Sequence, residues 1–222
     1  MSGVTVNRPW LRFDLGAEMQ VLSWAINKPG FVRASRIIWR EVRNADLPKD
    51  LNVRAWLDNE LRQHGSLDAI AFLTSRNVTA FHDITTQVYQ CTAQCVATVG
   101  LSNSERVGHR VQRPAGAWGT INVAVRLDRG LTQTGLIEAL SIATQARTAA
   151  IMDAGLALPA GKATGTGTDC IAVAAPVGPD DYAGLHTDIG EALGAAVYRA
   201  TLFGARDWLA DQPNLKEGTT DG

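Results

Sequence analysis

The sequence has few of the residues that short catalytic motifs are built from. Its 222 residues include three cysteines and four histidines, and neither a Cys-x-x-Cys nor a His-Glu-x-x-His motif is present. Those spacings are typical of metal centres. A Gly-x-Ser-x-Gly elbow and the Gly-Lys-Ser/Thr end of a phosphate loop are missing as well. These absences exclude the usual signatures of zinc hydrolases, α/β-hydrolases and P-loop proteins.

Charge of one sign and long apolar runs are also scarce. The 21 basic and 22 acidic residues are interspersed and give a net charge of −1, so a basic surface for nucleic acid is not expected. No segment approaches the roughly 20 apolar residues of a membrane helix, and the first residues lack the pattern of a secretory signal. An odd number of cysteines fits a reducing compartment. We therefore expect a cytoplasmic protein without nucleic-acid or membrane partners.

Length and patterning predict one domain of the α/β class, in the α+β sense. A chain of this length buries a full core, and no Pro/Ser-rich linker divides it. Strands fill the first half and long helices the second, which predicts a mixed or mostly antiparallel β-sheet covered by long helices. We expect residues 1–10 to be an N-terminal extension, 11–210 the domain, and 211–222 a disordered tail.

Period-two alternation of apolar residues predicts the strands. Cys91 and Cys95 would lie about 13 Å apart on one face of such a strand, which is too far for a shared metal, so we interpret both as core residues. The predicted strands are 11–15 and 19–23, as a hairpin around Gly16, then 36–42, 69–73, 89–99, 121–127 and 170–175.

Capping residues predict three helices. Asp50, Thr132 and Thr187 can each accept the free backbone amides at a helix start. In the last helix, Gly190 and Gly194 permit close packing against another helix. That partner helix could belong to the same subunit or to a second one, so a homo-oligomer is an open alternative.

One stretch, residues 163–191, brings glycines, hydroxyls, carboxylates and a histidine close together. Its glycine-rich run ends on Asp169, and glycines there would let backbone N–H groups converge on a ligand. A surface linker is the alternative. His186 and Glu191 bracket a helix start, and a histidine with a carboxylate is suited to proton transfer. An acid that merely satisfies the helix dipole is the alternative for Glu191. We expect both side chains to face the same site as Asp169.

Further polar residues stand at the ends of predicted strands, where loops often carry sites. Ser75, Asn103 and Asn122 are the examples, although turn chemistry explains each of them singly. His82 and Asp83 are adjacent, and we interpret them as a solvated turn in preference to a metal or acid–base pair.

Six segments of the chain occur in a recognisable order. The glycine-rich run and the His-Thr-x-x-Gly-Glu element are specific when they occur together. In this order the segments resemble the adenosylcobinamide amidohydrolase family, over roughly residues 12–205. The segments are Val21-Leu-Ser23, Phe72-Leu-Thr-Ser75, Thr98-Val-Gly-Leu-Ser-Asn103, Gly119-Thr-Ile-Asn122, Ala163-Thr-Gly-Thr-Gly-Thr-Asp169 and Gly184-Leu-His-Thr-Asp-Ile-Gly-Glu191.

The resemblance implies hydrolysis of the amide that joins the aminopropanol arm to the corrin ring of adenosylcobinamide. The products would be adenosylcobyric acid, for cobalamin salvage, and aminopropanol. The chain departs from the family pattern in three places: Asn27-Lys-Pro-Gly30, Thr98-Val-Gly100, and Gln145, where the family often has Glu. These departures bear on the range of substrates more than on the reaction. A non-catalytic corrinoid-binding protein and an amidohydrolase of another amide remain alternatives.

Amide hydrolysis needs a group that activates water, donors for the oxyanion, and an acid for the departing amine. We expect Asp169 or Glu191 to be the base and His186 the acid. A covalent route through Thr168, Ser75 or Ser102 stays open. No cofactor is expected, although Asp169, His186 and Glu191 also suit zinc or manganese as ligands. The expected substrate-binding residues are Thr166, Gly167, Thr168, Asn103, Asn122 and Ser75, with backbone amides of 165–168 toward the oxyanion.

Overall fold

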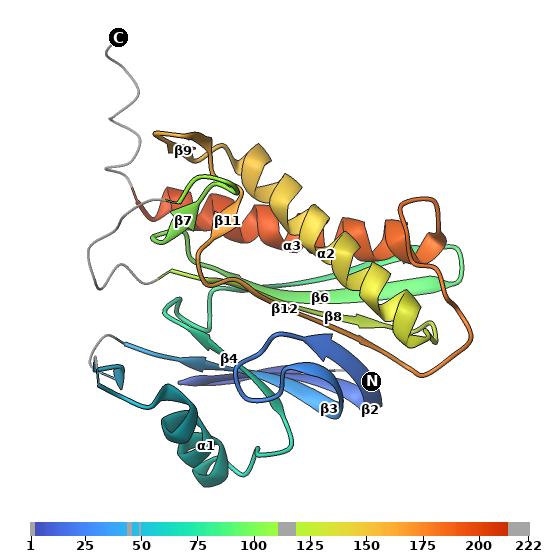
Figure 1. The fold of residues 1–222 in the computed structure, drawn as a ribbon, viewed down its shortest axis with the longest axis horizontal. Coiled ribbons are helices and arrows are strands. Elements are labelled where there is room, and N and C mark those ends of the chain that lie inside the picture. Colours follow the sequence, from blue (N-terminus) through green and yellow to red (C-terminus); the bar gives the residue numbers. More distant parts are fainter. Residues whose placement is uncertain (1–2, 44–45, 49, 111–118, 213–222) are drawn as a thin grey trace.

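The computed structural model describes residues 3–43, 46–48, 50–110 and 119–212. It consists of one large sheet, three helices and a few very short strands (Figure 1). The strands of the large sheet are β1 (Val4–Asn7), β2 (Trp10–Ser23), β3 (Gly30–Glu41), β4 (Ile70–Thr74), β5 (Phe81–Val88), β6 (Cys91–Val99), β8 (Ile121–Leu127) and β12 (Cys170–Ala175). The short strands are β7 (Ser104–Glu105), β9 (Ala157–Leu158), β10 (Gly161–Lys162) and β11 (Gly165–Thr166), and the helices are α1 (Val53–Gln63), α2 (Gln133–Ala154) and α3 (Asp188–Ala210).

The large sheet is mixed and mostly antiparallel, as predicted. Its strand order is β4-β3-β2-β12-β8-β6-β5, and β1 pairs with β2. Only β3 with β4, and β12 with β8, run parallel; the other pairs are antiparallel. The short strands form two separate pairs, β9 with β10 and β7 with β11. The second of these pairs holds the glycine-rich run against the loop that follows β6.

Two long helices cover one half of the sheet. In Figure 1, α2 and α3 lie side by side above β6, β8 and β12, and α3 also packs on β5. Every second residue of these strands points toward the helices and is buried there. Cys95, Val123 and Val173 are examples, and all three belong to one apolar cluster. Cys91 belongs to the same cluster, which confirms that both cysteines are core residues. No helix in the described part of the chain is long and apolar enough to cross a membrane.

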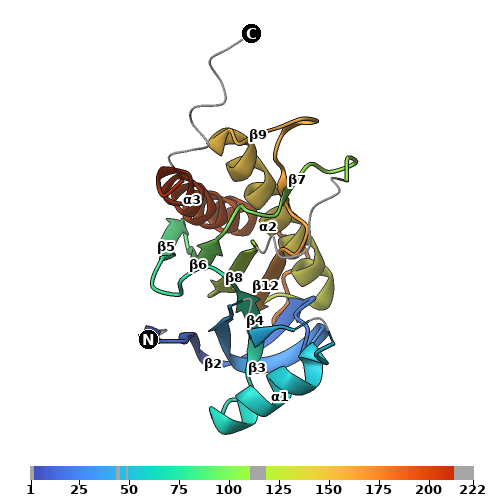
Figure 2. The ribbon, with the colours of Figure 1, turned by 90° about the vertical axis from the view of Figure 1, so that its left-hand side faces the viewer.

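The other half of the sheet curls over the first. Phe13 of β2 and Trp39 of β3 share a buried cluster with Val96, Ala124 and Ala172 from the opposite half. The helix α1 covers the outer face of β3 and β4 (Figures 1 and 2). This curvature brings the end of β4 to the beginning of β8, two strands that lie far apart in the sheet order.

A side-chain hydrogen bond joins the two halves where they meet. Asn122 of β8 is 1% exposed, and its Nδ2 donates to the main-chain oxygen of Leu73 in β4 at 2.8 Å. The bond satisfies a carbonyl at the edge of the sheet that no neighbouring strand could reach. The beginnings of β8 and β12 and the end of β4 therefore converge at one end of the curled sheet.

The N-terminal part of the chain differs from the prediction. Residues 4–7, expected to be an extension, form β1 and pair with β2. The predicted hairpin around Gly16 is wrong: β2 is one continuous strand, and its pairing with β3 shifts register between Asp14 and Met19. Gly16 has a φ of +81°, so it allows an irregularity within the strand and not a reversal of the chain.

Other helix and strand boundaries also differ from the prediction. Asn52, not Asp50, caps α1, since its side chain accepts the amide of Ala55. The strand β5 was not predicted; it contains His82, whose Nε2 lies 3.0 Å from the carboxylate of Asp207 in α3. The caps at Thr132 and Thr187 and the strands 121–127 and 170–175 are confirmed.

The glycines of α3 pack within this chain. A Cβ on Gly190 would lie 2.0 Å from the oxygen of Gly184, and one on Gly194 would meet Ile142 of α2 at 3.6 Å. The close approach at Gly190 is therefore used inside the subunit, against the loop that precedes α3, whereas a Cβ on Gly194 would make an ordinary contact with α2. The predicted tail overlaps residues 213–222, which lie outside the described residues.

Candidate active site

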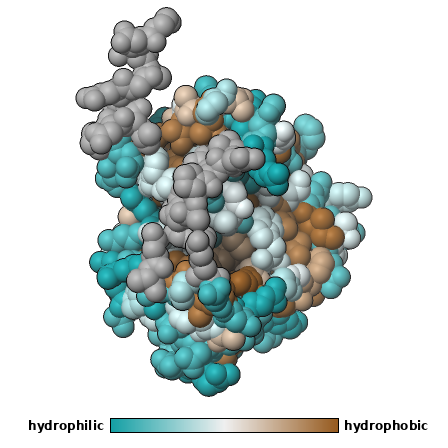
Figure 3. Space-filling view, turned by 60° about the vertical axis from the view of Figure 1, so that its left-hand side comes forward, coloured by the Kyte–Doolittle hydropathy of each residue, from teal (hydrophilic) through white to brown (hydrophobic). Residues whose placement is uncertain are grey.

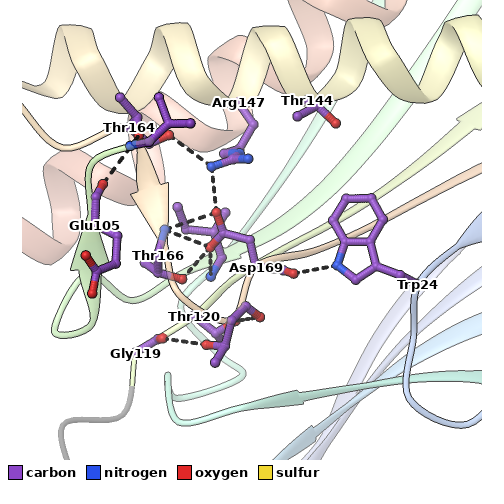
Figure 4. Close-up of polar contacts among 12 residues, drawn as sticks. Trp24, Glu105, Gly119, Thr120, Thr144, Arg147, Thr164, Thr166 and Asp169 are labelled. Atoms are coloured by element: carbon purple, nitrogen blue, oxygen red, sulfur yellow. Dashed lines mark hydrogen bonds and ion pairs between the residues drawn. The ribbon is translucent and has the colours of Figure 1, made fainter. Parts of the chain in front are cut away.

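Asp169, at the start of β12, is the centre of a buried polar cluster. Its Oδ2 lies 2.6 Å from Nη1 of Arg147 in α2, and the two side chains are 7% and 12% exposed. Oδ1 accepts the amide of Ile121 at 3.2 Å, and the Thr166 amide and hydroxyl also donate to the carboxylate (Figure 4). Burial raises the pKa of Asp169, and the charge of Arg147 opposes that rise.

The ion pair depends on a glycine beside it. A Cβ on Gly165 would lie 1.8 Å from Nη1 of Arg147 and 2.5 Å from Oδ2 of Asp169. The same Nη1 donates to the main-chain oxygen of Thr164 at 2.9 Å. The first glycine of the Thr-Gly-Thr-Gly-Thr run is thus required by packing, because any side chain there would displace the guanidinium.

Two of the four amides of residues 165–168 are occupied by the protein itself. The Thr166 amide donates to Asp169, and the Gly167 amide donates to the main-chain oxygen of Asn103 at 3.1 Å. The expectation that these two amides bind an oxyanion is therefore wrong. The run folds back on Asp169 and on the loop of Asn103, and this folding uses these two of the four amides that were expected to face a ligand.

Three hollows surround this cluster. We call the first the main cavity: its volume is about 620 Å³, and it is lined by residues that include Trp24, Phe72, Asn122, Asp169 and Cys170. The rim cavity, of about 140 Å³, adjoins it, because Leu47, Leu73 and Thr168 line both. The far cavity, of about 410 Å³, lies beside Arg147, Thr166 and Gly167. Asp169 lines both the main and the far cavities. Figure 3 shows apolar side chains recessed in a hollow of the face that it draws.

The expected substrate-binding residues divide between these hollows. Ser75 and Thr168 line the rim cavity, and Asn122 lines the main cavity. Thr166 and Gly167 line the far cavity, with Asn103 next to Gly167. Thr168 is exposed; its hydroxyl donates to the Gly119 oxygen at 3.0 Å, and its own main-chain oxygen accepts the Thr120 hydroxyl at 2.8 Å. The six residues therefore surround Asp169, but on two sides of the ion pair.

The main cavity has a mostly apolar wall with one thiol. Burial raises the pKa of Cys170 to about 12, so the thiol is protonated at neutral pH and is a poor nucleophile. Trp24 stands at the same wall and is 45% exposed. Its Nε1 donates to the main-chain oxygen of Asp169 at 2.7 Å.

His186 and Glu191 lie at the other end of the sheet. They flank the start of α3, where Thr187 caps the helix and the Ala183 amide donates to Glu138 near the start of α2. Between them and Asp169 runs the whole of β12, whose six residues span about 20 Å. Figure 1 places the start of α3 at the end of the molecule away from β11. The expectation that both side chains face the site of Asp169 is wrong, because β12 leads the chain away from it.

The three residues considered as metal ligands are separated in the same way. In the part of the chain that the structure describes, no group of three or more His, Cys, Asp or Glu side chains could hold a metal ion. Asp169 has Arg147 as its charged partner, and a guanidinium occupies the position where a cation would compensate the carboxylate.

One comparison with known proteins covers nearly the whole chain. A family model described as adenosylcobinamide amidohydrolase matches residues 2–213. The chain belongs to that family. The resemblance found in the sequence is thereby confirmed, and this adenosylcobinamide amidohydrolase family member carries the buried Asp169 cluster inside the matched range.

Two further similarities are more limited. The chain is 35% identical over 88 residues to the uncharacterized protein MJ1613 of Methanocaldococcus jannaschii, with 38% of this chain and 34% of that protein covered. It therefore spans about a third of that relative's length. A crystal structure of the PH0078 protein from Pyrococcus horikoshii OT3 aligns with a TM-score of 0.43 at 11% identity, covering 88% of this chain and 76% of that one.

Sequence reasoning missed two residues of the site. Arg147 lies at the spacing of the apolar face of α2, and a charged residue on a buried face requires a counter-charge; that was the available signal. Trp24 gave no signal beyond being an aromatic residue at the end of a strand. The departure at Gln145 is on the exposed side of α2, where its Nε2 lies 3.2 Å from Ser141, and it lines none of the three cavities.

Proposed function

We propose that the protein hydrolyses the amide between the aminopropanol arm and the corrin ring of adenosylcobinamide. The products are adenosylcobyric acid and aminopropanol, and the reaction serves cobalamin salvage in the cytoplasm. Membership of the family supports the substrate class. The observation that carries the proposal is the position of Asp169, a buried carboxyl on the wall of a cavity large enough for part of a ligand.

Asp169 is the acid–base group of this proposal. Among the described residues it is the one carboxyl that lines the main or the rim cavity. Burial raises its pKa and so strengthens it as a base. It takes a proton from the attacking water and passes that proton to the departing nitrogen, so that one carboxyl serves both halves of the reaction. Arg147 and Thr166 orient it.

The amide lies at Thr168, where the rim and main cavities meet. Thr168 and Asp169 both line the main cavity, so an amide bound at the Thr168 side chain lies at the same wall as the acid–base group. Ser75, on the wall of the rim cavity, binds a corrin side-chain amide, and Asn122 contacts the part of the substrate that enters the main cavity. Thr166, Gly167 and Asn103 support Asp169 from the far cavity. His186 and Glu191 take no part in this mechanism.

Product analysis tests the proposal. Purified protein is incubated with adenosylcobinamide, and adenosylcobyric acid and aminopropanol are measured by chromatography and mass spectrometry. The matched variant is Asp169→Asn, which keeps the shape of the side chain and removes its basicity. Wild-type turnover that falls by about 10²-fold or more in the variant supports the assignment. Equal turnover in both proteins would exclude Asp169 as the acid–base group.

Two other functions make different predictions in the same assay. A corrinoid-binding protein without hydrolase activity would retain the corrinoid on equilibrium dialysis and release no cobyric acid. An amidohydrolase of another amide would neither bind nor cleave complete or incomplete corrinoids. No cofactor is needed in the proposed mechanism, and activity after dialysis against EDTA, compared with activity after added zinc or manganese, tests that point.

A further inference from the structure

The indole of Trp24 is held in place but not covered. Trp24 follows β2, and its Nε1 donates to the main-chain oxygen of Asp169. Asp169 is itself fixed by Arg147, Thr166 and the Ile121 amide, so the partner of the indole belongs to a rigid buried cluster. The residue nevertheless remains 45% exposed, and it lines the main cavity. An aromatic face with a fixed orientation and an open side is a stacking surface.

The other walls of the cavity restrict what can lie against that face. Ile26, Leu51 and Phe72 make the lining apolar, and no Lys or Arg is among its described lining residues. A phosphate or carboxylate would therefore find no counter-charge there. Asn122 also lines the cavity, but it is 1% exposed, and its Nδ2 is used by the main-chain oxygen of Leu73. These walls suit a planar, uncharged ring.

We propose that the main cavity binds the adenine of the substrate's adenosyl group, stacked on Trp24. This inference rests on the proposed function and adds a specificity site to it. A corrin ring with its amide arms is several times larger than an adenosine, whereas the cavity holds about 620 Å³. The corrin ring therefore stays outside, across the rim with Ser75 and Thr168, while the adenosyl group enters. Trp24 makes the protein selective for adenosylated corrinoids.

Two variants separate stacking from the hydrogen bond of the indole. Trp24→Phe keeps an aromatic face, Trp24→Leu keeps only apolar volume, and both lose the bond to Asp169 equally. The ligands are adenosylcobyric acid and cyanocobyric acid, which lack the scissile arm and are not turned over. Affinities are measured by equilibrium dialysis with the corrin absorbance as readout, and thermal melting checks that both variants are folded.

The expected result is a difference between the variants that depends on the ligand. Trp24→Leu should bind adenosylcobyric acid roughly tenfold more weakly than Trp24→Phe does, since base stacking on an aromatic ring contributes on that order. The two variants should bind cyanocobyric acid equally. Equal affinities for the adenosylated ligand, or the same difference with the cyano ligand, would overturn the adenine site.

The outcome is separable from that of the hydrolase assay. Ligand-dependent discrimination without any release of aminopropanol from adenosylcobinamide would leave the adenine site standing and refute the hydrolase function. If the wild-type protein hydrolyses adenosylcobinamide but the two Trp24 variants bind both ligands alike, the hydrolase function stands and the adenine site is refuted. Free adenosine, added as a competitor, should displace adenosylcobyric acid and leave bound cyanocobyric acid in place if the site is as proposed.

Discussion

Arg147 and Asp169 form an ion pair between α2 and the start of β12, with 2.6 Å between Nη1 and Oδ2. Both side chains are almost completely removed from solvent, and the carboxylate also accepts hydrogen bonds from Thr166 and Ile121. The pair fixes the glycine-rich run, the Trp24 indole and the start of the strand at once. Such a pair is costly to break from one side, because the remaining charge is then buried without a partner.

Replacing Arg147 alone should therefore destabilise the protein strongly. We expect Arg147→Met to lower the free energy of unfolding by about 3–5 kcal/mol, the usual cost of an orphaned buried charge. The double variant Arg147→Met/Asp169→Asn removes that charge and should recover part of the loss. Urea denaturation followed by circular dichroism measures both. A double variant as unstable as the sum of the two single variants would show that the pair is not coupled.

The same variant should change the pH dependence of stability. Burial raises the pKa of Asp169 in the folded protein, and loss of Arg147 removes the charge that opposes this rise. A carboxyl with a raised pKa binds more protons folded than unfolded, so stability increases as the pH falls from the folded pKa toward 3.8, the ordinary value. Relative to wild type, Arg147→Met should thus regain stability in acid. Urea midpoints measured at several pH values between neutral and acid test this, and parallel curves for the two proteins would contradict it.

Two glycines of one loop provide a matched test of packing. Gly165→Ala places a Cβ 1.8 Å from Arg147 Nη1, so the ion pair must separate or move. In Gly167→Ala the nearest atom is Asn103 Nδ2, at 3.3 Å, on a side chain that can shift. We expect Gly165→Ala to cost about 1–3 kcal/mol or more, as overpacking does, and Gly167→Ala to cost less than that range. Thermal unfolding of both variants tests this expectation. Similar melting temperatures would show that the structure around Gly165 accommodates a Cβ without separating the ion pair.

Much of the fold could be predicted because its signals are local. The strand 121–127 alternates residue by residue, and Thr132 and Thr187 cap helices through bonds to residues three positions away. The hairpin at Gly16 could not be excluded locally. A glycine with positive φ suits both a tight turn and a bulge, and the choice between them was made by β3, which pairs along the whole of β2.

The site was only partly predictable, for a different reason. Asp169 and Thr168 were identified because they lie at the start of a strand after a glycine-rich run. Arg147 and Trp24 reach Asp169 from elements distant in the sequence, through contacts that depend on how α2 and β2 lie against β12. His186 is close to Asp169 in sequence, yet an extended strand separates them. Proximity along the chain was therefore a poor guide to proximity in the site.

That separation leads to a test of the acid–base group. We expect His186→Ala and Glu191→Gln to keep turnover of adenosylcobinamide within about twofold of wild type, because neither side chain reaches the cavities. Asp169→Asn should lower turnover by about 10²-fold or more, the usual contribution of a positioned acid–base group. The variants are compared at saturating substrate, after confirming equal melting temperatures for the two surface changes. A large loss in His186→Ala would mean that the start of α3 contributes to the site, and Asp169 would then have a partner outside this arrangement.

Two threonine variants can test on which side of the Arg147–Asp169 ion pair the substrate binds. Thr168 lines the rim and main cavities, whereas Thr144 of α2 lines the far cavity, where its hydroxyl donates to the Leu140 oxygen at 2.9 Å. Valine keeps the volume of either side chain and removes the hydroxyl. If the amide binds at Thr168, Thr168→Val should reduce kcat/KM about tenfold, the effect of losing one hydrogen bond of roughly 1.4 kcal/mol. Thr144→Val should leave kcat/KM nearly unchanged. The opposite ranking would place the substrate in the far cavity, on the side of Arg147, and would assign the expected binding role to Thr166 and Gly167 instead.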